Sequence, residues 1–288
     1  MSKQIHVGAV AVGGGAPVSI QSMCNTPTQD VERTVSQILR LERAGCQIIR
    51  VAVPDMDAAR AIGPIRRRIN IPLVADIHFD YRLALECVRQ GVDKIRINPG
   101  NIGSAEKVRA VADACRDRGI PIRIGVNGGS LERELLQKYG GVTAQALVDS
   151  ALGHVRLLND CNFDDICISV KCSHVPVNMA AYRMLHEQTH YPLHLGVTEA
   201  GTPRLGVLKS AIGIGGLLCQ GIGDTLRVSL TADPEEEVRA ALDILSAAGL
   251  RERLLTLFSG TESGEVFEVI VQSFGFKYGI PPESDLVP

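Results

Sequence analysis

The 288-residue sequence contains no tryptophan, no secretory signal at its start and no uninterrupted apolar run that would span a membrane. Without tryptophan, the core must be built mainly from aliphatic side chains. The formal net charge of −2 argues against a nucleic-acid-binding or polybasic membrane-binding surface. We therefore expect a cytoplasmic protein that binds neither nucleic acid nor membrane.

The sequence also lacks any Cys-x-x-Cys pair, and no cysteine follows Cys219. In a chain without a secretory signal, the eight cysteines are expected to be reduced and mostly buried. Cys161, Cys167 and Cys172 form a local cluster, but their spacing matches no common metal motif. We predict that they pack in the core and that the chain holds no metal of its own.

Eight short apolar segments each end with polar or charged residues at alternate positions. Side chains alternate between the two faces of a strand, so each segment has one apolar and one polar face. Val51, Leu195 and Val197 are thereby assigned to the face that packs on helices. A polar face that converges at the strand ends is typical of a (β/α)8 TIM barrel. The predicted strands are 18–23, 48–54, 73–78, 94–100, 121–127, 166–171, 193–198 and 225–230.

Helical patterns lie between these strands, which indicates parallel pairing with right-handed crossovers. Asp30, Ser104, Thr143 and Asp233 are predicted helix N-caps, and Gly45, Gly91 and Gly119 are predicted left-handed C-caps. Residues 5–18 predict a β-hairpin that plugs the bottom of the barrel. An open doubly wound sheet is the rival, but the chain has no Gly-rich nucleotide fingerprint after a strand. The predicted helices are 31–44, 57–68, 81–90, 105–118, 144–159, 177–188, 205–219 and 234–247.

Five cations occupy polar-face positions and should converge in the barrel mouth: Arg50, Arg96, Arg123, Lys171 and Arg227. Burying them without partners would be very costly. Asp76 and Glu199 would neutralise two of them, which leaves an excess of about three positive charges. A ligand with several negative charges accounts for this excess, and a diphosphate fits better than a single carboxylate.

Other residues at the strand ends add donors and acid–base groups. The Gly125–Ser130 turn offers backbone N–H groups beside Asn127, which suits phosphate oxygens. Asp76, His78 and Glu199 are the candidates for proton transfer. His194 lies deeper in its strand and is expected to pack or bond internally.

Taken in order, the strand-end motifs resemble those of the 4-hydroxy-3-methylbut-2-enyl diphosphate synthases of non-mevalonate isoprenoid biosynthesis. The resemblance runs from about His6 to Arg253. It rests on Gln21-Ser-Met23, Arg50-Val-Ala-Val-Pro54, Ala75-Asp-Ile-His-Phe79, Arg96-Ile-Asn-Pro-Gly-Asn-Ile-Gly103, Ile124-Gly-Val-Asn-Gly-Gly-Ser130, Ser169-Val-Lys171, Leu195-Gly-Val-Thr-Glu-Ala-Gly201 and Gly221-Ile-Gly-Asp-Thr-Leu-Arg-Val-Ser229.

The resemblance implies an oxidoreductase that opens 2-C-methyl-D-erythritol 2,4-cyclodiphosphate and removes a hydroxyl with two electrons. It implies that Glu199 protonates or steers the departing hydroxyl and that Asp76 and His78 line the pocket. It also implies a homodimer and electrons from flavodoxin or ferredoxin through a [4Fe–4S] cluster. The residues that it assigns to substrate binding are Arg50, Arg96, Asn98, Arg123, Asn127, Lys171, Thr198, Arg227 and Ser229.

The resemblance ends where the family continues into its iron–sulfur domain. That domain holds the iron with a Cys-Pro-x-Cys pair, a later cysteine and a glutamate, whereas no cysteine follows Cys219 here. We therefore expect a substrate-binding barrel over residues 1–253 and a short, atypical tail over 254–288, with a strand or short helix over 265–274. A chain without cluster ligands should bind substrate but not reduce it.

Three interpretations follow. The chain is a family member whose cluster domain was lost by frameshift, truncation or gene-model error. Alternatively, it is a barrel-only phosphate-binding protein, either regulatory or completed by a separate cluster subunit. The third is a different barrel enzyme, such as a pterin-using synthase or an aldolase with Lys171 as Schiff-base amine. Borohydride trapping with a carbonyl substrate separates the aldolase from the first two.

The gene distinguishes the first two interpretations. Since the composition changes abruptly after Arg253, we expect a second reading frame beyond that codon to encode Cys-Pro-x-Cys. DNA sequencing of this region and the intact mass of the protein test this. A mass matching 288 residues, with no such motif in any forward frame, would establish a barrel-only protein.

Overall fold

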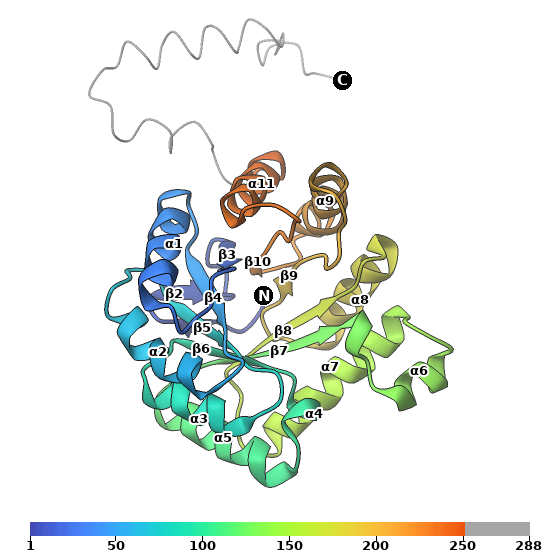
Figure 1. Cartoon of the computed structure of the whole chain (residues 1–288). Helices are drawn as coiled ribbons and strands as arrows, with labels where there is room; N and C mark the ends of the chain where they lie inside the picture. The colour runs from blue at the N-terminus through green and yellow to red at the C-terminus, as the bar shows by residue number, and fades with distance from the viewer. Residues whose placement is uncertain (251–288) are drawn as a thin grey trace, which may run out of the picture. The chain divides into compact units, whose positions relative to one another are not determined.

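The computed structural model describes residues 1–250. Eight parallel strands form one sheet in the order β8-β7-β6-β5-β4-β3-β10-β9, and a parallel bridge between Ile168 and Leu193 joins its two edges. The result is the predicted TIM barrel, with a ring of helices outside the strands (Figure 1). The strands are β3 (Ser19–Met23), β4 (Ile48–Ala52), β5 (Leu73–Asp76), β6 (Lys94–Ile97), β7 (Ile122–Asn127), β8 (Ile166–Lys171), β9 (His194–Leu195) and β10 (Thr225–Leu226).

The helices follow the predicted alternation with three local differences. The helix expected over 205–219 is three pieces: α9 (Pro203–Ser210), the π-helix η2 (Ala211–Gly215) and α10 (Gly216–Leu218). Two short helices in the mouth loops, α4 (Pro99–Ile102) and α6 (Arg133–Tyr139), and a 3-10 turn, η1 (Gly128–Ser130), were not predicted. The other helices are α1 (Val31–Arg43), α2 (Met56–Arg66), α3 (Tyr81–Arg89), α5 (Ala105–Asp117), α7 (Ala144–Asn159), α8 (Val175–Gln188) and α11 (Pro234–Ala247).

The helix ends largely follow the local chemistry of the sequence. Asp30 and Thr143 accept hydrogen bonds from the backbone N–H groups of Arg33 and Ala146. Ser104 and Asp233 occupy the N-cap position without such a bond. The predicted C-cap glycines, at positions 45, 91 and 119, all have φ in the left-handed region. No helix within residues 1–250 is both long and apolar enough to cross a membrane.

The hairpin of β1 (Ile5–Val7) and β2 (Val10–Val12) covers the amino-terminal end of the barrel, as predicted. Its inward side chains pack against Ile48, Val74 and Cys167, the lowest inward-facing residues of β4, β5 and β8. Because this apolar cluster closes the bottom, the interior opens only toward the carboxyl ends of the strands. The domain boundary at 253 and the element expected over 265–274 lie outside the described residues.

The plug should contribute measurably to stability. Ile5 is 3% exposed, whereas His6 on the same strand is exposed. We expect Ile5→Ala to lower the free energy of unfolding by about 2 kcal/mol or more, and His6→Ala to change it by less than about 0.5 kcal/mol. Urea unfolding of both variants measures the difference, and equal effects would show that the hairpin lies on the barrel without stabilising it.

Candidate functional site

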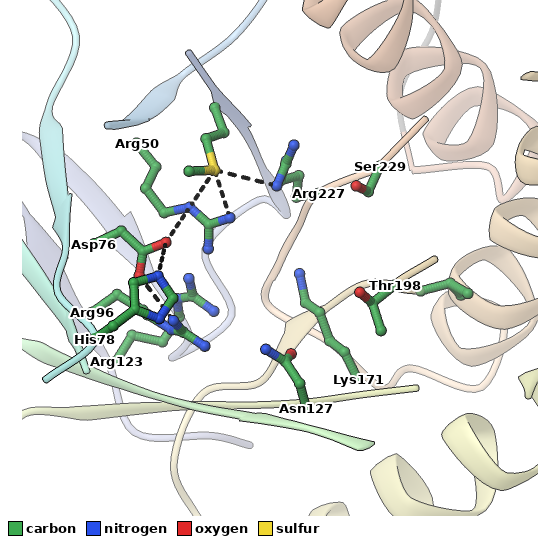
Figure 2. Close-up of a pocket in the computed structure, with 12 residues that line it drawn as sticks. Arg50, Asp76, His78, Arg96, Arg123, Asn127, Lys171, Thr198, Arg227 and Ser229 are labelled. Carbon is green, nitrogen blue, oxygen red and sulfur yellow. Dashed lines mark hydrogen bonds and ion pairs between the residues drawn. The ribbon is translucent and has the colours of Figure 1, made fainter. Parts of the chain in front are cut away.

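A cavity of about 270 Å³ opens at the carboxyl ends of the strands. All predicted site residues except Asn98 and Glu199 line it, together with Met23 and Val197. Figure 2 shows Arg50, Asp76, His78, Arg96 and Arg123 on one side of this space, with Asn127, Lys171, Thr198, Arg227 and Ser229 facing them from the other. The alternation of the strands is therefore sufficient to bring together residues that are distant in sequence.

The register of β5, β6 and β7 places Arg96 and Arg123 side by side on one wall of the cavity, which we call the cationic wall. Asp76 pairs with Arg96 across β5 and β6, and Arg96 pairs with Arg123 across β6 and β7. All three side chains face inward at neighbouring positions. Arg96 lies across Gly125, where a Cβ atom would be 2.2 Å from its Nε. Glycine at position 125 therefore makes room for a buried guanidinium.

Asp76 is the charge partner of this wall. Its carboxylate accepts from Arg96 Nη1 at 2.9 Å and lies 3.6 Å from Arg50 Nε. Burial alone would raise its pKa, but Arg50, Arg96 and Arg123 hold the pKa of Asp76 well below its usual range. A carboxylate that stays ionised in this way aligns guanidinium groups. These ion pairs favour a positioning role over the predicted proton transfer.

The second carboxylate of the site is Glu237, which the sequence analysis missed. It lies on α11 and is 4% exposed, and its Oε2 is 3.1 Å from Arg227 Nη2. It takes the charge-balancing role assigned to Glu199, for which the structure shows no ion pair within residues 1–250. A signal existed: Glu237 belongs to the same helical face as Ala241 and Ile244, whereas Glu236 points outward.

Several guanidinium donors in the cavity have weak partners or none. Arg50 directs Nη2 to the thioether sulfur of Met23 at 2.8 Å, and Arg227 approaches the same sulfur at 3.5 Å. The Nε and Nη2 atoms of Arg123 have no hydrogen-bond partner within residues 1–250. Since thioethers are weak acceptors, the Arg50 and Arg227 donors that face Met23 remain available for the oxygens of an anion.

Burial destabilises the charged forms of the cations of the site. It lowers the pKa of Arg123 to about 10 and, with four nearby arginines, lowers the pKa of Lys171 well below its usual range. A bound anion would offset these penalties. Lys171 is 8% exposed and lies beside Gly196, where a Cβ atom would be 2.5 Å from its Nζ.

Three predicted residues lie at the edge of this arrangement. His78 lines the cavity with a side chain 55% exposed, and its Nε2 is 3.7 Å from Asp76 Oδ2. Asn98 is absent from the lining, because its Oδ1 caps α4 by accepting from Gly100 N. Glu199 has a left-handed backbone (φ 52°) and lines an adjoining cavity with Gly128 and Thr198.

A polar layer lies beneath the cationic wall, and the sequence analysis overlooked part of it. Lys94 and His194 are fully buried, and neither Lys94 Nζ nor the two ring nitrogens of His194 have a hydrogen-bond partner within residues 1–250. Burial lowers the pKa of Lys94 to about 8 and that of His194 well below its usual range. Lys94 alternates with Arg96, so strand periodicity alone predicts its inward direction.

The described residues do not fit an iron–sulfur cluster. No group of three or more His, Cys, Asp or Glu side chains within residues 1–250 is arranged to hold a metal. Seven of the cysteines are buried, and burial raises the pKa of Cys24 and Cys46 to about 12, which disfavours thiolates.

The chain is similar to proteins of known activity over most of its length. A family model described as the GcpE TIM-barrel domain matches residues 2–242. The 4-hydroxy-3-methylbut-2-en-1-yl diphosphate synthase (flavodoxin) of Ruminiclostridium cellulolyticum is 56% identical over 90% of this chain and 73% of its own length. The protein of the same name from Azotobacter vinelandii is 61% identical over 88% of this chain and 68% of its own.

Solved structures share the fold at low sequence identity. The dihydropteroate synthase of Yersinia pestis superposes with a TM-score of 0.60 at 12% identity, covering 86% of this chain and all of that one. The enzyme from Stenotrophomonas maltophilia gives 0.61 at 15% identity, covering 85% and 97%. This likeness extends to the barrel architecture alone.

Lys94 should make stability depend on pH. Its folded pKa of about 8 lies below the usual value of about 10.4, so the unfolded chain binds more protons between these pH values. The free energy of unfolding should therefore rise with pH across this window. Lys94→Met should lose that rise and be more stable than the parent near pH 7, by on the order of 3 kcal/mol.

Urea unfolding between pH 7 and 10 measures the effect, with Lys107→Met at the surface as the control. Parallel curves for the parent and Lys94→Met would show that the Lys94 pKa is not lowered.

Proposed function

This chain belongs to the GcpE TIM-barrel family, and on that premise we propose that its barrel binds 2-C-methyl-D-erythritol 2,4-cyclodiphosphate for conversion to (E)-4-hydroxy-3-methylbut-2-enyl diphosphate. The observation that carries the proposal is the charge balance of the cavity. Arg50, Arg96, Arg123, Lys171 and Arg227 converge there, whereas the carboxylates paired with them are Asp76 and Glu237. The excess of positive charge suits the two ionised phosphoryl groups of this substrate.

In this proposal the cavity aligns the diphosphate before any bond breaks. Arg50, Arg123 and Arg227 present guanidinium donors that the protein leaves poorly satisfied. Asn127, Thr198 and Ser229 add amide and hydroxyl donors at the rim. Because Arg50 and Arg123 are buried and lie in strands, and Arg227 is held by Glu237, little reorganisation of these guanidinium groups accompanies binding.

The proposed reaction breaks the bond between carbon and a phosphate oxygen that closes the ring and expels a hydroxyl as water. It consumes two electrons from the donor protein and two protons: one proton joins the hydroxyl to leave as water, the other is taken up by the freed phosphate oxygen, and a double bond forms between the two carbons that lose oxygen. Glu199 is the proposed proton donor to the departing hydroxyl, since it lies at the mouth beside Thr198 and is exposed to solvent. His78 is the other group at this rim that could exchange a proton with water.

We further propose that a chain of these 288 residues binds this substrate without reducing it. The full sequence has no cysteine after Cys219, and the described cysteines do not gather into a ligand set. The names of the relatives include flavodoxin, which supports flavodoxin as the electron donor of an intact enzyme; ferredoxin is the proposed alternative. A homodimer and a cluster domain supplied by the same or another chain complete this proposal.

Substrate binding can be tested without any electron donor. Calorimetric titration with the cyclic diphosphate should show saturable binding, and Arg50→Met should weaken it by about 30-fold or more. The control is Arg60→Met, which removes an exposed arginine on α2 outside the cavity. Absence of binding by the parent chain, or equal losses in the two variants, would contradict the proposed site.

A further inference from the structure

The barrel ladder is interrupted between β8 and β9. Ile168 N donates to Pro192 O at 2.9 Å, and the bridge between Ile168 and Leu193 is where this pairing stops. If the ladder continued, the N–H groups of Val170 and Cys172 would meet the carbonyls of His194 and Gly196. On the other edge of β9 the pairing with β10 is regular. The seam between β8 and β9 is therefore open at its upper end, directly beside Lys171 and Thr198.

The amide of Asn178 stands in the place of one missing ladder bond. Cys172 N donates to Asn178 Oδ1 at 3.0 Å, and Asn178 Nδ2 donates to Gly196 O at 3.2 Å. Asn178 is fully buried on α8. A single side chain thus joins the donor and the acceptor that two adjacent strands would otherwise share.

The hydroxyl of Tyr182 occupies the acceptor of the preceding ladder bond. It donates to His194 O at 2.6 Å, the carbonyl that the Val170 N–H would meet in a continuous ladder. Tyr182 is also fully buried, one helical turn after Asn178. The spacing fits, because four helical residues rise about 6 Å and two strand residues about 6.6 Å.

This insertion separates the strand ends that carry two site residues. Lys171 immediately precedes Cys172, and Thr198 follows Gly196 by two residues. The ammonium end of Lys171, its Nζ and Cε atoms, lies beside Gly196 in the space that a Cβ atom would fill. A closed ladder would bring the two strands together at this point and narrow that space. Val197, expected to face the helices, also lines the cavity here, since regular pairing of β9 ends at Leu195.

We propose that Asn178 and Tyr182 are positioning residues that hold the seam between β8 and β9 open and thereby aim the Lys171 ammonium at the bound diphosphate. This inference rests on the proposed function, because it requires a diphosphate in the cavity. Neither side chain lines the cavity. Their effect on binding must therefore pass through the placement of Lys171.

A double-mutant cycle tests this dependence with inorganic pyrophosphate as the probe. We expect Asn178→Ala to weaken pyrophosphate binding by roughly tenfold and Tyr182→Phe by roughly threefold. In a Lys171→Met background, each change should cost less than about twofold, because the group that they position is gone. A role in stability alone would give the same loss in both backgrounds.

Tyr191→Phe is the matched control. Tyr191 is 5% exposed, and its hydroxyl donates to Asn159 and Asp164 at a distance from the cavity. It should lower the melting temperature about as much as Tyr182→Phe and leave pyrophosphate binding unchanged. If Asn178→Ala does not fold, Tyr182→Phe alone still decides the question in the two backgrounds.

The outcomes separate this inference from the proposed function. If the parent chain binds neither pyrophosphate nor the cyclic diphosphate, the proposed function fails. If the parent binds, and the Asn178 and Tyr182 variants bind equally well or lose the same factor with and without Lys171, the diphosphate site stands and the positioning role is overturned.

Discussion

The burial of like charges in one barrel mouth is the constraint on which the rest of the site depends. Guanidinium and ammonium groups lose hydration there, and the described residues supply only Asp76 and Glu237 as their ion-pair partners. The cations of the cavity therefore repel one another, and this repulsion underlies the proposal that an anion with several charges binds there. In the proposed function, a neutral molecule would bind poorly, because only a negatively charged ligand offsets the cost of desolvating these cations.

The scaffold supports this charge by geometry. The apolar hairpin closes the lower end of the barrel, so the cations face solvent from one side only. Glycines at positions 125 and 196 leave room for Arg96 and Lys171. Asn178 and Tyr182 join the strands through side chains where the backbone ladder stops. These features together accommodate long cationic side chains in a barrel interior that would otherwise be filled by packed aliphatic groups.

The likeness to dihydropteroate synthases shows how little the fold contributes to specificity. Those structures share the barrel at 12–15% identity, whereas the relatives at 56–61% identity are diphosphate synthases. What distinguishes a member of this family is therefore the set of residues at the strand ends. One barrel can present different side chains on the same strands, and chemistry follows those side chains.

Sequence alone was sufficient for the barrel, the plugging hairpin and most of the cavity lining, because a period of two assigns every strand residue to a face. Alternation placed Arg50, Arg96 and Arg123 together without any knowledge of distance. Alternation could not predict the ion pairs of the site, because Glu237 contacts Arg227 from α11, a helix that packs outside the strands. Asn98 caps α4, a short helix that composition does not reveal, and it therefore does not line the cavity.

The interruption between β8 and β9 was likewise decided by packing, since two buried side chains of α8 take the backbone groups that strand periodicity assigns to the sheet. Periodicity is a property of neighbours along the chain, whereas charge partners and ladder breaks depend on elements brought together only by the closed barrel.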